Sequence, residues 1–309
     1  MGVIVETFIG KTDIRTFLLP FSSNLNDFDV VHVMSPPYAA LESHKHLVVT
    51  VAEPVATELP FYPRKARLLA YPALLAESIV FRKKARFIAI SETTRNKIQA
   101  HFSLPKSQVS VIPCGVDSDR FAPGKKENET PRIVLCSRLD KRKNVPEAIR
   151  AFSAIPGQLS SMVIIGDGAE KRKLAELARK SNKKITLMGS VDHNELQAIL
   201  SRSEIFVTTS LSEGFGLSLL EAMSAGCAVI ASNIGAHTEL VRHMNNGLVY
   251  KTQEELTQMM EVLLKDGELV RRLGAKARET ALQYTWRKVA QRTLDLYESL
   301  PDSEVPTKT

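Results

Sequence analysis

The sequence predicts an α/β protein made of two Rossmann-like halves, and three observations lead to that fold class. Short β-rich apolar runs alternate with helical patterns, which is typical of parallel βαβ units. At the usual ~100–200 residues per domain, a chain of 309 residues is long enough for two domains. Between the halves, residues 121–131 combine two prolines, a glycine and several charges, so this stretch is predicted to be an interdomain linker.

The predicted elements follow one another in βα order. In the first half, strands are expected at 3–7, 30–34, 47–51, 87–90 and 109–112, and helices at 64–83 and 92–101. In the second half, strands are expected at 133–136, 162–165, 185–188, 205–208, 228–231 and 248–250. Helices are expected between these strands at 145–154, 169–180, 194–200, 217–225 and 238–243, and residues 253–300 are predicted to form several more.

Composition excludes several other classes of protein. Hydrophobic residues make up 44% of the chain and charged residues 24%, so it is not expected to be disordered. No apolar stretch reaches the ~18 residues of a membrane span, and charges within the first twenty positions argue against a secretory signal peptide. Three widely spaced cysteines fit neither a disulfide framework nor a zinc site. The expected location is therefore cytoplasmic.

The excess positive charge is concentrated in one segment. Residues 61–100 contain nine basic and two acidic side chains, an excess equal to the net charge of +7 for the whole chain. Aromatic residues and a largely apolar run, 68–80, lie between the basic clusters 64–67 and 82–86. The pattern fits a solvated helix face beside a core stripe, and it fits equally well a surface that binds an anionic membrane. No nucleic-acid-binding motif accompanies the charge, so nucleic acid is not an expected partner.

The densest group of candidate functional residues lies at 209–226, after one predicted strand and at the start of a predicted helix. Gly214 and Gly216 allow a sharp turn and a close approach of the backbone to a ligand. The free amides where the helix starts, near Leu217, form an anion site. Glu213 precedes the helix and Glu221 lies inside it, so the two carboxylates can address different hydroxyls of one ligand. Either glutamate alone is better explained as a solvated side chain, but the whole segment suits a nucleotide-sugar.

A second candidate segment, 137–144, follows the first strand of the second half. Ligands of open α/β sheets bind at the carboxyl ends of strands, and this segment places Arg138 and Lys143 there. Arg138 can bind phosphate oxygens in a bidentate manner, and Lys143 can add a point charge. Judged alone, the segment could equally be an exposed basic turn. Gly166 and Gly168 also follow a strand, but without a third glycine they indicate only a turn into a helix.

These residues match a known family pattern. The chain resembles the family-4 retaining glycosyltransferases of the GT-B fold, because Glu213 and Glu221 have the spacing of that family's E-x7-E motif within its EGFG…EAM…G signature. Residues 137–143 are similar to its GRLxxxKG segment, and 111–117, followed by Phe121 and Pro123, to its viPnGvD…F.P stretch. Segments 165–168, 235–239 and 246–247 also follow the family order.

The resemblance implies a role for each matched residue. Catalysis would involve Glu213, which contacts the transferred sugar, and Arg138 and Lys143, which neutralise the leaving diphosphate. The donor-binding residues would be Gly214, Phe215, Gly216, Leu217 and Ser218 around the sugar and phosphates, Glu221 at the ribose and Val191 near the base. No metal and no cofactor are implied, since these cations take the place of a metal. Residues 117–119 read Asp-Ser-Asp but are interpreted as a turn.

The sequence also departs from the family pattern. The glycine-rich βα unit that opens family members is missing, so the N-terminal domain is expected to be shortened. Ala52 and Glu53 occupy the place where a histidine usually follows the strand at 48–51, and Glu53 or His32 are candidates to replace it. Cys114 replaces an asparagine of the motif and Asn144 its second glycine. These changes are expected to affect acceptor binding more than donor binding.

The sequence therefore predicts a GT-B fold with two Rossmann-like domains facing a cleft. The expected domains are an acceptor-side domain at 1–122, a nucleotide-sugar-binding domain at 131–285, and a helix and tail at 286–309 that return to the first domain. The predicted function is retaining, metal-independent transfer of a hexose from a nucleotide-diphosphate sugar to a glycan or lipid-linked acceptor, with an anionic membrane surface as a partner for 61–100. A non-catalytic nucleotide-sugar-binding or scaffold subunit is the first alternative, and a sugar-nucleotide epimerase of the same fold is a weaker one.

Overall fold

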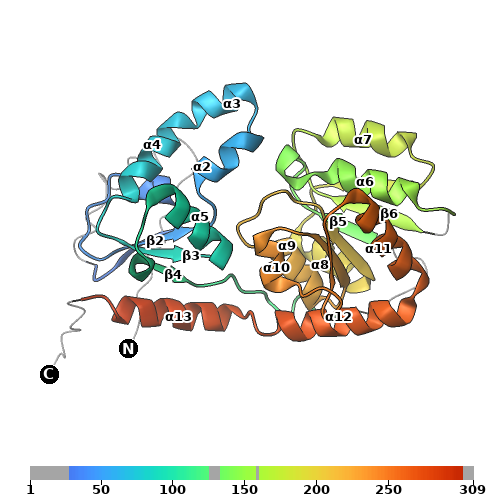
Figure 1. Ribbon diagram of the computed structural model, residues 1–309. Helices are drawn as coiled ribbons and strands as arrows, with labels where there is room; N and C mark the ends of the chain where they lie inside the picture. Colours follow the sequence, from blue (N-terminus) through green and yellow to red (C-terminus); the bar gives the residue numbers. More distant parts are fainter. Residues whose placement is uncertain (1–27, 125–132, 158–159, 302–309) are drawn as a thin grey trace. The chain divides into compact units, whose positions relative to one another are not determined.

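The computed structural model describes residues 28–124, 133–157 and 160–301, which form two compact units (Figure 1). In the described part, the first unit contains 28–90, 94–111 and 293–301, and the second contains 91–93 and the rest of 112–292. The units therefore divide at 111–112, upstream of the stretch predicted to be the linker. Phe121 is buried and its carbonyl accepts a hydrogen bond from Ser224 Oγ, so the start of that stretch is packed into the second unit. The strand predicted at 3–7 lies outside the described residues.

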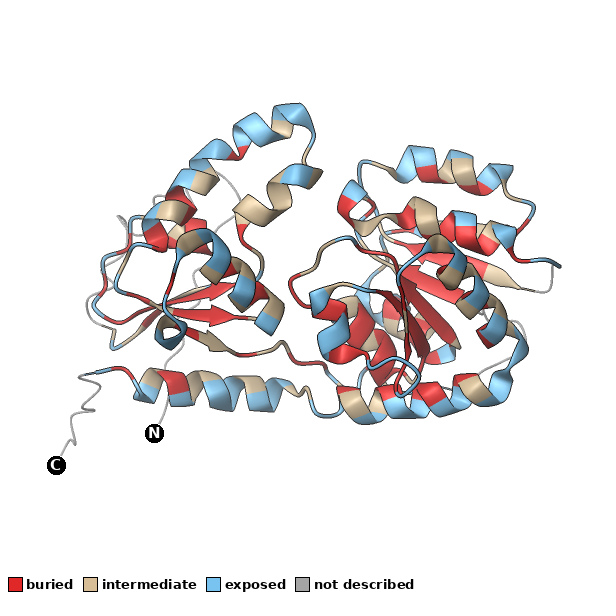
Figure 2. Ribbon diagram, in the orientation of Figure 1, coloured by how far each residue is buried: buried red, intermediate tan, exposed pale blue. Residues whose placement is uncertain are grey.

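In the part that the structure describes, the first unit is built on four parallel strands in sequential order, β1-β2-β3-β4. The strands are β1 (Val31–Val33), β2 (Leu47–Val51), β3 (Arg86–Ala89) and β4 (Val109–Val111). In the register, Val49 of β2 pairs with Val33 on one side and with Phe87 on the other. All of β2 is buried, as the red strands in Figure 2 show. The four strands expected within the described part of this half are confirmed.

Short helices connect these strands. They are α2 (Val55–Glu58), α3 (Arg64–Leu69), α4 (Tyr71–Val80) and α5 (Glu92–Phe102), with 3-10 turns at Pro36–Ala39, Leu59–Phe61 and Lys106–Gln108. The single helix predicted over 64–83 is wrong, because the chain forms two helices that meet at Ala70 and end at Val80. Pro72 explains the break: it has no N–H, and its ring excludes the carbonyl four residues earlier, so it occupies the first turn of α4.

The end of α13 (Trp286–Glu298) belongs to the first unit. Tyr297 near its carboxyl end forms a hydrogen bond through its hydroxyl with His32 Nδ1, and the two rings meet edge to face. His32 Nε2 lies 2.7 Å from Thr50 Oγ1 of β2. Both nitrogens of this histidine therefore have partners inside the unit, and burial lowers its pKa to about 4.

The second unit contains a six-stranded parallel sheet in the order β10-β9-β8-β5-β6-β7. Its strands are β5 (Ile133–Cys136), β6 (Ser161–Ile165), β7 (Lys184–Gly189), β8 (Ile205–Thr208), β9 (Ala228–Ser232) and β10 (Leu248–Tyr250), so all six expected strands are confirmed. Its helices are α6 (Val145–Ala154), α7 (Lys171–Lys180), α8 (His193–Arg202), α9 (Leu217–Ser224), α10 (Gly235–Leu240), α11 (Gln253–Lys265) and α12 (Gly267–Ala281). The order of the strands reverses between β5 and β8, which is the arrangement of a doubly wound Rossmann fold.

The central strands β5, β8 and β9 are buried on both faces, which is why they are continuous apolar runs, whereas the edge strand β7 alternates between exposed and half-buried residues (Figure 2). On one face, Leu135 and Val207 join a core with Ile149 of α6 and Met260 of α11. Local signals set the helix starts: Asp192 caps α8 through the amides of Asn194 and Glu195, and Thr252 and Asp266 cap α11 and α12. The helix predicted at 238–243 lies three residues earlier, as α10.

Candidate functional site

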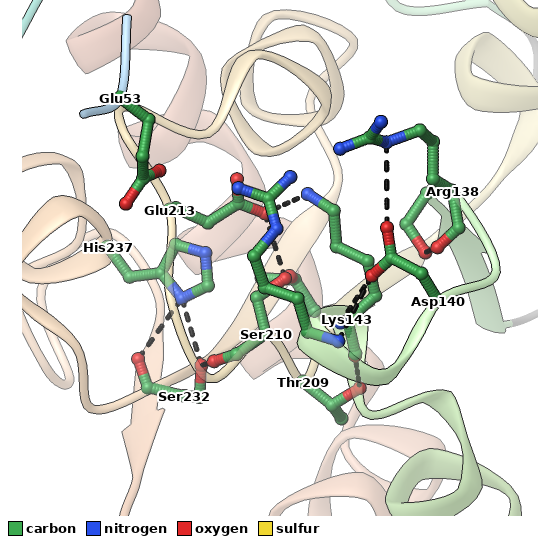
Figure 3. Close-up of polar contacts among 12 residues, drawn as sticks. Glu53, Arg138, Asp140, Lys143, Thr209, Ser210, Glu213, Ser232 and His237 are labelled. Atoms are coloured by element: carbon green, nitrogen blue, oxygen red, sulfur yellow. Dashed lines mark hydrogen bonds and ion pairs between the residues drawn. The ribbon is translucent and has the colours of Figure 1, made fainter. Parts of the chain in front are cut away.

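The point where the sheet order reverses brings two loops together. The loop after β5 contains 137–144 and the loop after β8 contains 209–216, and both follow the carboxyl ends of neighbouring strands. The Leu211 amide donates to the Arg142 carbonyl at 2.8 Å, and Thr209 Oγ1 donates to the Lys143 carbonyl at 2.9 Å. In open α/β sheets ligands bind at this switch point. The two candidate segments predicted from the sequence are therefore held side by side (Figure 3).

Lys143 and Glu213 form a mostly buried ion pair between these loops. Their side chains are 12% and 13% exposed, and Ser210 Oγ donates a second hydrogen bond to Glu213 at 2.8 Å. Burial alone would raise the pKa of Glu213, but the charge and hydrogen bond of Lys143, together with Ser210, outweigh burial and lower it. Glu213 is therefore an ionised acceptor at neutral pH, and Lys143 is fixed beside it.

The backbone before Lys143 is shaped by Asp140. Its carboxylate caps the 3-10 turn Lys141–Lys143, accepting from the amides of Arg142 at 3.0 Å and Lys143 at 3.3 Å. Asn144 then adopts a left-handed conformation with φ of 48° and leads directly into α6. Asparagine is among the few non-glycine residues that adopt this conformation readily, so it can serve where the family motif has glycine.

Arg138 occupies a different environment. Its side chain is 68% exposed, and Nε lies 3.6 Å from Asp140 Oδ2, which makes a surface ion pair of small energetic value. Two glycines hold its segment in place from the neighbouring strand: a Cβ on Gly166 would lie 1.8 Å from the Ser137 carbonyl oxygen, and one on Gly168 would lie 2.5 Å from that of Leu139. The turn at 166–168 thus packs tightly against the loop that carries Arg138.

The glycine-rich segment turns into α9 at Gly216, whose φ of 101° strains any residue with a side chain. Phe215 turns its ring inward, 5.9 Å from the ring of Tyr284. Leu217 is the first residue of α9, so the amides of this first turn have no acceptor within the helix. The amino end of the helix also carries partial positive charge, which favours anions. The segment therefore offers backbone donors beside the ionised Glu213.

Glu221 lies one turn inside α9. Burial raises its pKa to about 7, and the charge of Arg120 opposes that increase. The Cys136 thiol, at the end of β5, has its pKa raised by burial and by Glu221, while Lys143 lowers it, so both charged groups lie around this strand end. Arg120 also donates to Asn194 Oδ1 at 2.9 Å. Val191 is half-buried after the edge strand β7, which is separated from β5 by β6.

Metal sites and membrane-spanning helices are two other classes of feature that the described residues can be compared with. In the described part of the chain, no three histidine, cysteine, aspartate or glutamate side chains gather in a way that could hold a metal ion. Asp117 accepts a hydrogen bond from the Arg120 amide at 3.0 Å, which fits the turn expected at 117–119. Among the same described residues, no helix combines the length and apolar character required to cross a bilayer.

Comparison with known proteins decides the family. The model of the family "Glycosyl transferases group 1" matches residues 117–280, more than half of the chain, and that of "Glycosyltransferase Family 4" matches 12–120. The chain belongs to the glycosyl transferases group 1. The resemblance inferred from the two glutamates and the 137–143 segment is thereby confirmed.

Two curated relatives from this family illustrate its range. The phosphatidylinositol N-acetylglucosaminyltransferase gpi3 subunit of Schizosaccharomyces pombe is 28% identical over 241 residues, covering 73% of this chain and 53% of that protein. A GDP-mannose-dependent alpha-(1-6)-phosphatidylinositol monomannoside mannosyltransferase of Mycobacterium tuberculosis is 29% identical over 230 residues, covering 67% of this chain and 60% of that protein. The chain thus spans little more than half the length of these relatives.

Solved structures of glycosyl transferases share the fold. Sucrose-phosphate synthase from Thermosynechococcus elongatus matches with a TM-score of 0.78 at 22% identity, covering 91% of this chain and 76% of that one. Anabaena HepE in complex with UDP and glucose matches with a TM-score of 0.78 at 19% identity, covering 92% and 81%. These likenesses establish the GT-B fold for this member of the group.

Two of the departures from the family pattern, at 52–53 and at the missing histidine, lie in the first unit. Ala52 is exposed after β2, and Glu53 forms an ion pair with Lys97 of α5. His32, the other candidate to replace the family's histidine, is held between Thr50 and Tyr297 and is neutral at pH 7. The second unit contains residues that sequence reasoning missed, above all Arg120, Asp140 and His237. Asp140 could have been found from its position before a short helical turn, whereas Arg120 and His237 act on residues distant in sequence.

Proposed function

We propose that this protein is a retaining, metal-independent glycosyltransferase that moves a hexose from a nucleotide-diphosphate sugar to a glycan or lipid-linked acceptor. One observation carries the proposal: the ion pair of Lys143 and Glu213 lies at the switch point of the second sheet, beside the glycine-rich start of α9. An anion-binding helix start, a fixed cation and an ionised carboxylate together complement phosphates and sugar hydroxyls.

The proposed roles follow from the chemistry of each group. Glu221 accepts from the ribose hydroxyls, Glu213 accepts from hydroxyls of the transferred sugar, and Val191 lies near the base. Lys143 and Arg138 neutralise the diphosphate as it departs, and cations placed there lower the barrier because negative charge develops on the leaving group in the transition state. The exposed position of Arg138 leaves its guanidinium accessible to a ligand.

Names of relatives support a nucleotide-sugar as the donor. Structural neighbours have been solved with UDP and with UDP-glucose, and one curated relative is named as GDP-mannose-dependent. The names of two relatives contain phosphatidylinositol or phosphatidylinositol monomannoside, which fits a lipid-linked acceptor.

The test begins with a panel of UDP-, GDP- and ADP-sugars, scored by binding and then by release of the nucleotide. Glu213→Gln, Glu221→Gln and Arg138→Ala should each reduce donor turnover by at least tenfold, since each removes one charged contact. Glu279→Gln on α12 removes an exposed carboxylate and serves as the matched control. Undiminished turnover in all three site variants would overturn the proposal.

Two additional readouts separate the alternatives. Retention predicts that the anomeric configuration of the donor is kept in the product, and metal independence predicts unchanged turnover in EDTA. Binding of a donor without release on any acceptor would favour a non-catalytic subunit, a reading that the exposed Ala52 at the end of β2 keeps open. Conversion of the donor sugar with no acceptor present would indicate an epimerase.

We further propose that the first unit docks on an anionic membrane at the cytoplasmic face, through the α3–α4 surface. This surface consists of exposed large apolar side chains and exposed basic ones on adjoining turns, namely Leu68, Leu69, Tyr71, Leu75 and Ile79 with Arg64, Lys65 and Arg67. The second basic cluster is partly occupied, because Lys83 donates to the Ala39 carbonyl and Arg86 to that of Ser107. Arg67 in the first cluster likewise donates to the carbonyls of Pro60 and Tyr62. We propose 64–67 as the charged part of the docking surface because it adjoins the exposed Leu68 and Leu69.

A further inference from the structure

His237 is a buried polar side chain that has no part in the roles proposed above. It lies in α10, after β9, and its side chain is inaccessible to solvent. Its Nδ1 lies 3.2 Å from the Ser232 carbonyl oxygen and 3.1 Å from Ser232 Oγ (Figure 3). Nε2, on the other side of the ring, has no hydrogen-bond partner among the described residues.

The surrounding hydrogen bonds fix which nitrogen carries the proton. Ser232 Oγ donates its own proton to the Ser210 carbonyl at 2.6 Å, so both oxygens of Ser232 are acceptors toward the ring. Nδ1 must therefore be the protonated nitrogen, and Nε2 presents a bare lone pair. Burial lowers the pKa of His237 to about 4 despite the opposing charge of Glu213, so the ring is neutral at pH 7.

The bare nitrogen faces the segment that begins α9. A Cβ on Gly216 would lie 3.6 Å from His237 Cδ2 and 3.9 Å from Nε2, and the charge of Glu213 acts on the ring. In Figure 3 the free side of the ring points away from Ser232 and toward Glu213. A buried acceptor without a partner is unfavourable, so a ligand that displaces the atoms covering Nε2 and donates to it gains binding energy. Two acceptors, a carboxylate and an imine nitrogen, thus face the same part of the site.

We propose that His237 Nε2 accepts a hydrogen bond from a hydroxyl of the transferred sugar and thereby contributes to donor specificity. The inference rests on the proposed function, since it requires a nucleotide-sugar at the switch point. The lone pair demands a donor, and the ionised diphosphate of a nucleotide-sugar has none to offer. A sugar hydroxyl supplies one by donating its proton to Nε2, and a second hydroxyl of the same sugar can donate to Glu213.

A matched pair of variants tests this role. His237→Asn keeps an amide N–H near the position of Nδ1 for the Ser232 carbonyl but has no acceptor at the place of Nε2. His237→Gln reaches that place with an acceptor. Calorimetric titrations use UDP, UDP-glucose, UDP-N-acetylglucosamine and GDP-mannose, and thermal unfolding of each variant verifies that it is folded.

The expected result is a selective loss. His237→Asn should bind the free nucleoside diphosphate of the accepted donor as the wild type does, but bind the nucleotide-sugar itself about tenfold more weakly, and His237→Gln should recover part of that affinity. Donor analogues that lack one hydroxyl identify the partner: one of them should bind the wild type about tenfold more weakly and lose nothing further in His237→Asn.

Other outcomes overturn the inference. Equal binding of UDP and of the nucleotide-sugar by wild type and His237→Asn shows that the ring makes no contact with the sugar. An equal loss for both ligands shows that the ring only supports the loop. If the wild type binds none of the four ligands and no ADP-sugar either, the proposed function fails and this inference falls with it.

A measurement on the wild type covers the case in which the variants do not fold. In protein labelled with 15N-histidine, the unprotonated Nε2 has a resonance well separated from that of the protonated Nδ1. Addition of the accepted nucleotide-sugar should shift the Nε2 resonance toward hydrogen-bonded values, and addition of UDP should leave it in place. An Nε2 resonance that the nucleotide-sugar does not move contradicts the proposal.

Discussion

At Glu221, burial and the nearby Arg120 act in opposite directions on one carboxyl group. Burial prevails, and the pKa rises from the ordinary 4.5 to about 7. The folded protein therefore binds this proton more tightly than the unfolded chain does, so the free energy of unfolding falls as the pH rises from about 4.5 to 7, and the loss is complete above 7. A carboxylate kept at this cost in stability is typical of a functional position.

Glu221→Gln should make the protein more stable at pH 8 and weaken donor binding at the same time. Each pKa unit corresponds to about 1.4 kcal/mol, so a shift from 4.5 to about 7 predicts that removing the ionisable group adds about 3 kcal/mol at pH 8 and little at pH 4.5. Urea unfolding at both pH values measures this difference, with Glu279→Gln as a control that should show none. Equal effects of Glu221→Gln at both pH values would refute the assignment.

Single residues of the site were predictable where chemistry and spacing coincide along the chain. Glu213, Glu221 and Lys143 stand in local patterns next to strand ends, so their convergence followed from parallel-sheet topology. His237 was not predictable as a site residue, because the place of its unpaired nitrogen beside Gly216 depends on a contact between segments about twenty residues apart, which no local pattern encodes. The pairing of Lys143 with Glu213 was missed for the same reason.

Among the elements, the turn after β6 has a role beyond reversing the chain. Gly166, with φ of 133°, and Gly168 bring that turn into contact with the backbone of 137–139, and the Leu139 amide donates to the Asp167 carbonyl at 2.8 Å. The sequence showed only an incomplete glycine fingerprint here. Each glycine leaves space for the neighbouring loop only because of the register in which β5 pairs with β6. The glycine motif carries no information about that register.

Gly166→Ala should destabilise the protein by more than about 3 kcal/mol and reduce donor affinity, because its Cβ would overlap the Ser137 carbonyl and displace the loop that carries Arg138. Gly157→Ala is the matched control: it has a similar positive φ of 84° but nothing within 4 Å, so it should cost only about 1 kcal/mol and leave donor binding intact. Urea unfolding and calorimetry measure both. Similar costs for the two variants would contradict the packing role.

The α3–α4 surface is expected to bind anionic vesicles. The wild type should sediment with vesicles that contain phosphatidylglycerol, but not with pure phosphatidylcholine vesicles, and binding should weaken as salt shortens the Debye length to about 10 Å at 0.1 M. Replacing Arg64, Lys65 and Arg67 with glutamine should reduce binding by about two orders of magnitude, at about 1 kcal/mol per charge.

Two variants make this test specific. Replacing Leu68, Leu69 and Leu75 with glutamine removes exposed apolar area and should also weaken binding. Replacing Arg172, Lys173 and Lys180 of α7 removes the same charge from exposed positions in the second unit and should change little. If the α7 variant loses as much as the α3 variant, attraction is set by net charge and the docking surface is wrong.

Element positions were more predictable than element boundaries. Strands such as β2, β5 and β8 were placed correctly because buried parallel strands are short, β-branched apolar runs bounded by turn residues. The helix expected at 64–83 failed because its apolar residues continue across Ala70, and hydrophobic periodicity alone does not reveal where Pro72 restarts the hydrogen-bond ladder.

At the scale of the whole molecule, the proposed donor contacts are confined to one of the two units. Every residue proposed to contact the donor belongs to the second unit. The accepted nucleotide-sugar should therefore slow amide hydrogen exchange in β5, β8 and α9 and leave β1 to β4 unchanged. At a hundredfold excess over Kd, it should raise the free energy of opening in those three elements by up to about 2.7 kcal/mol. Equal protection of both sheets would show that the donor site is not confined to the second unit.

Trp286 is the chain's single tryptophan and begins α13 with half of its surface exposed. Its backbone touches Gly115, where an added Cβ would lie 2.5 Å from the Trp286 nitrogen. These two positions flank the places where the chain passes between the units, 111–112 and 292–293. The wavelength of maximum indole emission shifts with the polarity around the ring, and no second tryptophan masks the signal. The protein thus carries an intrinsic fluorescent reporter at its crossover, and a rearrangement there can be followed in real time without attaching a dye.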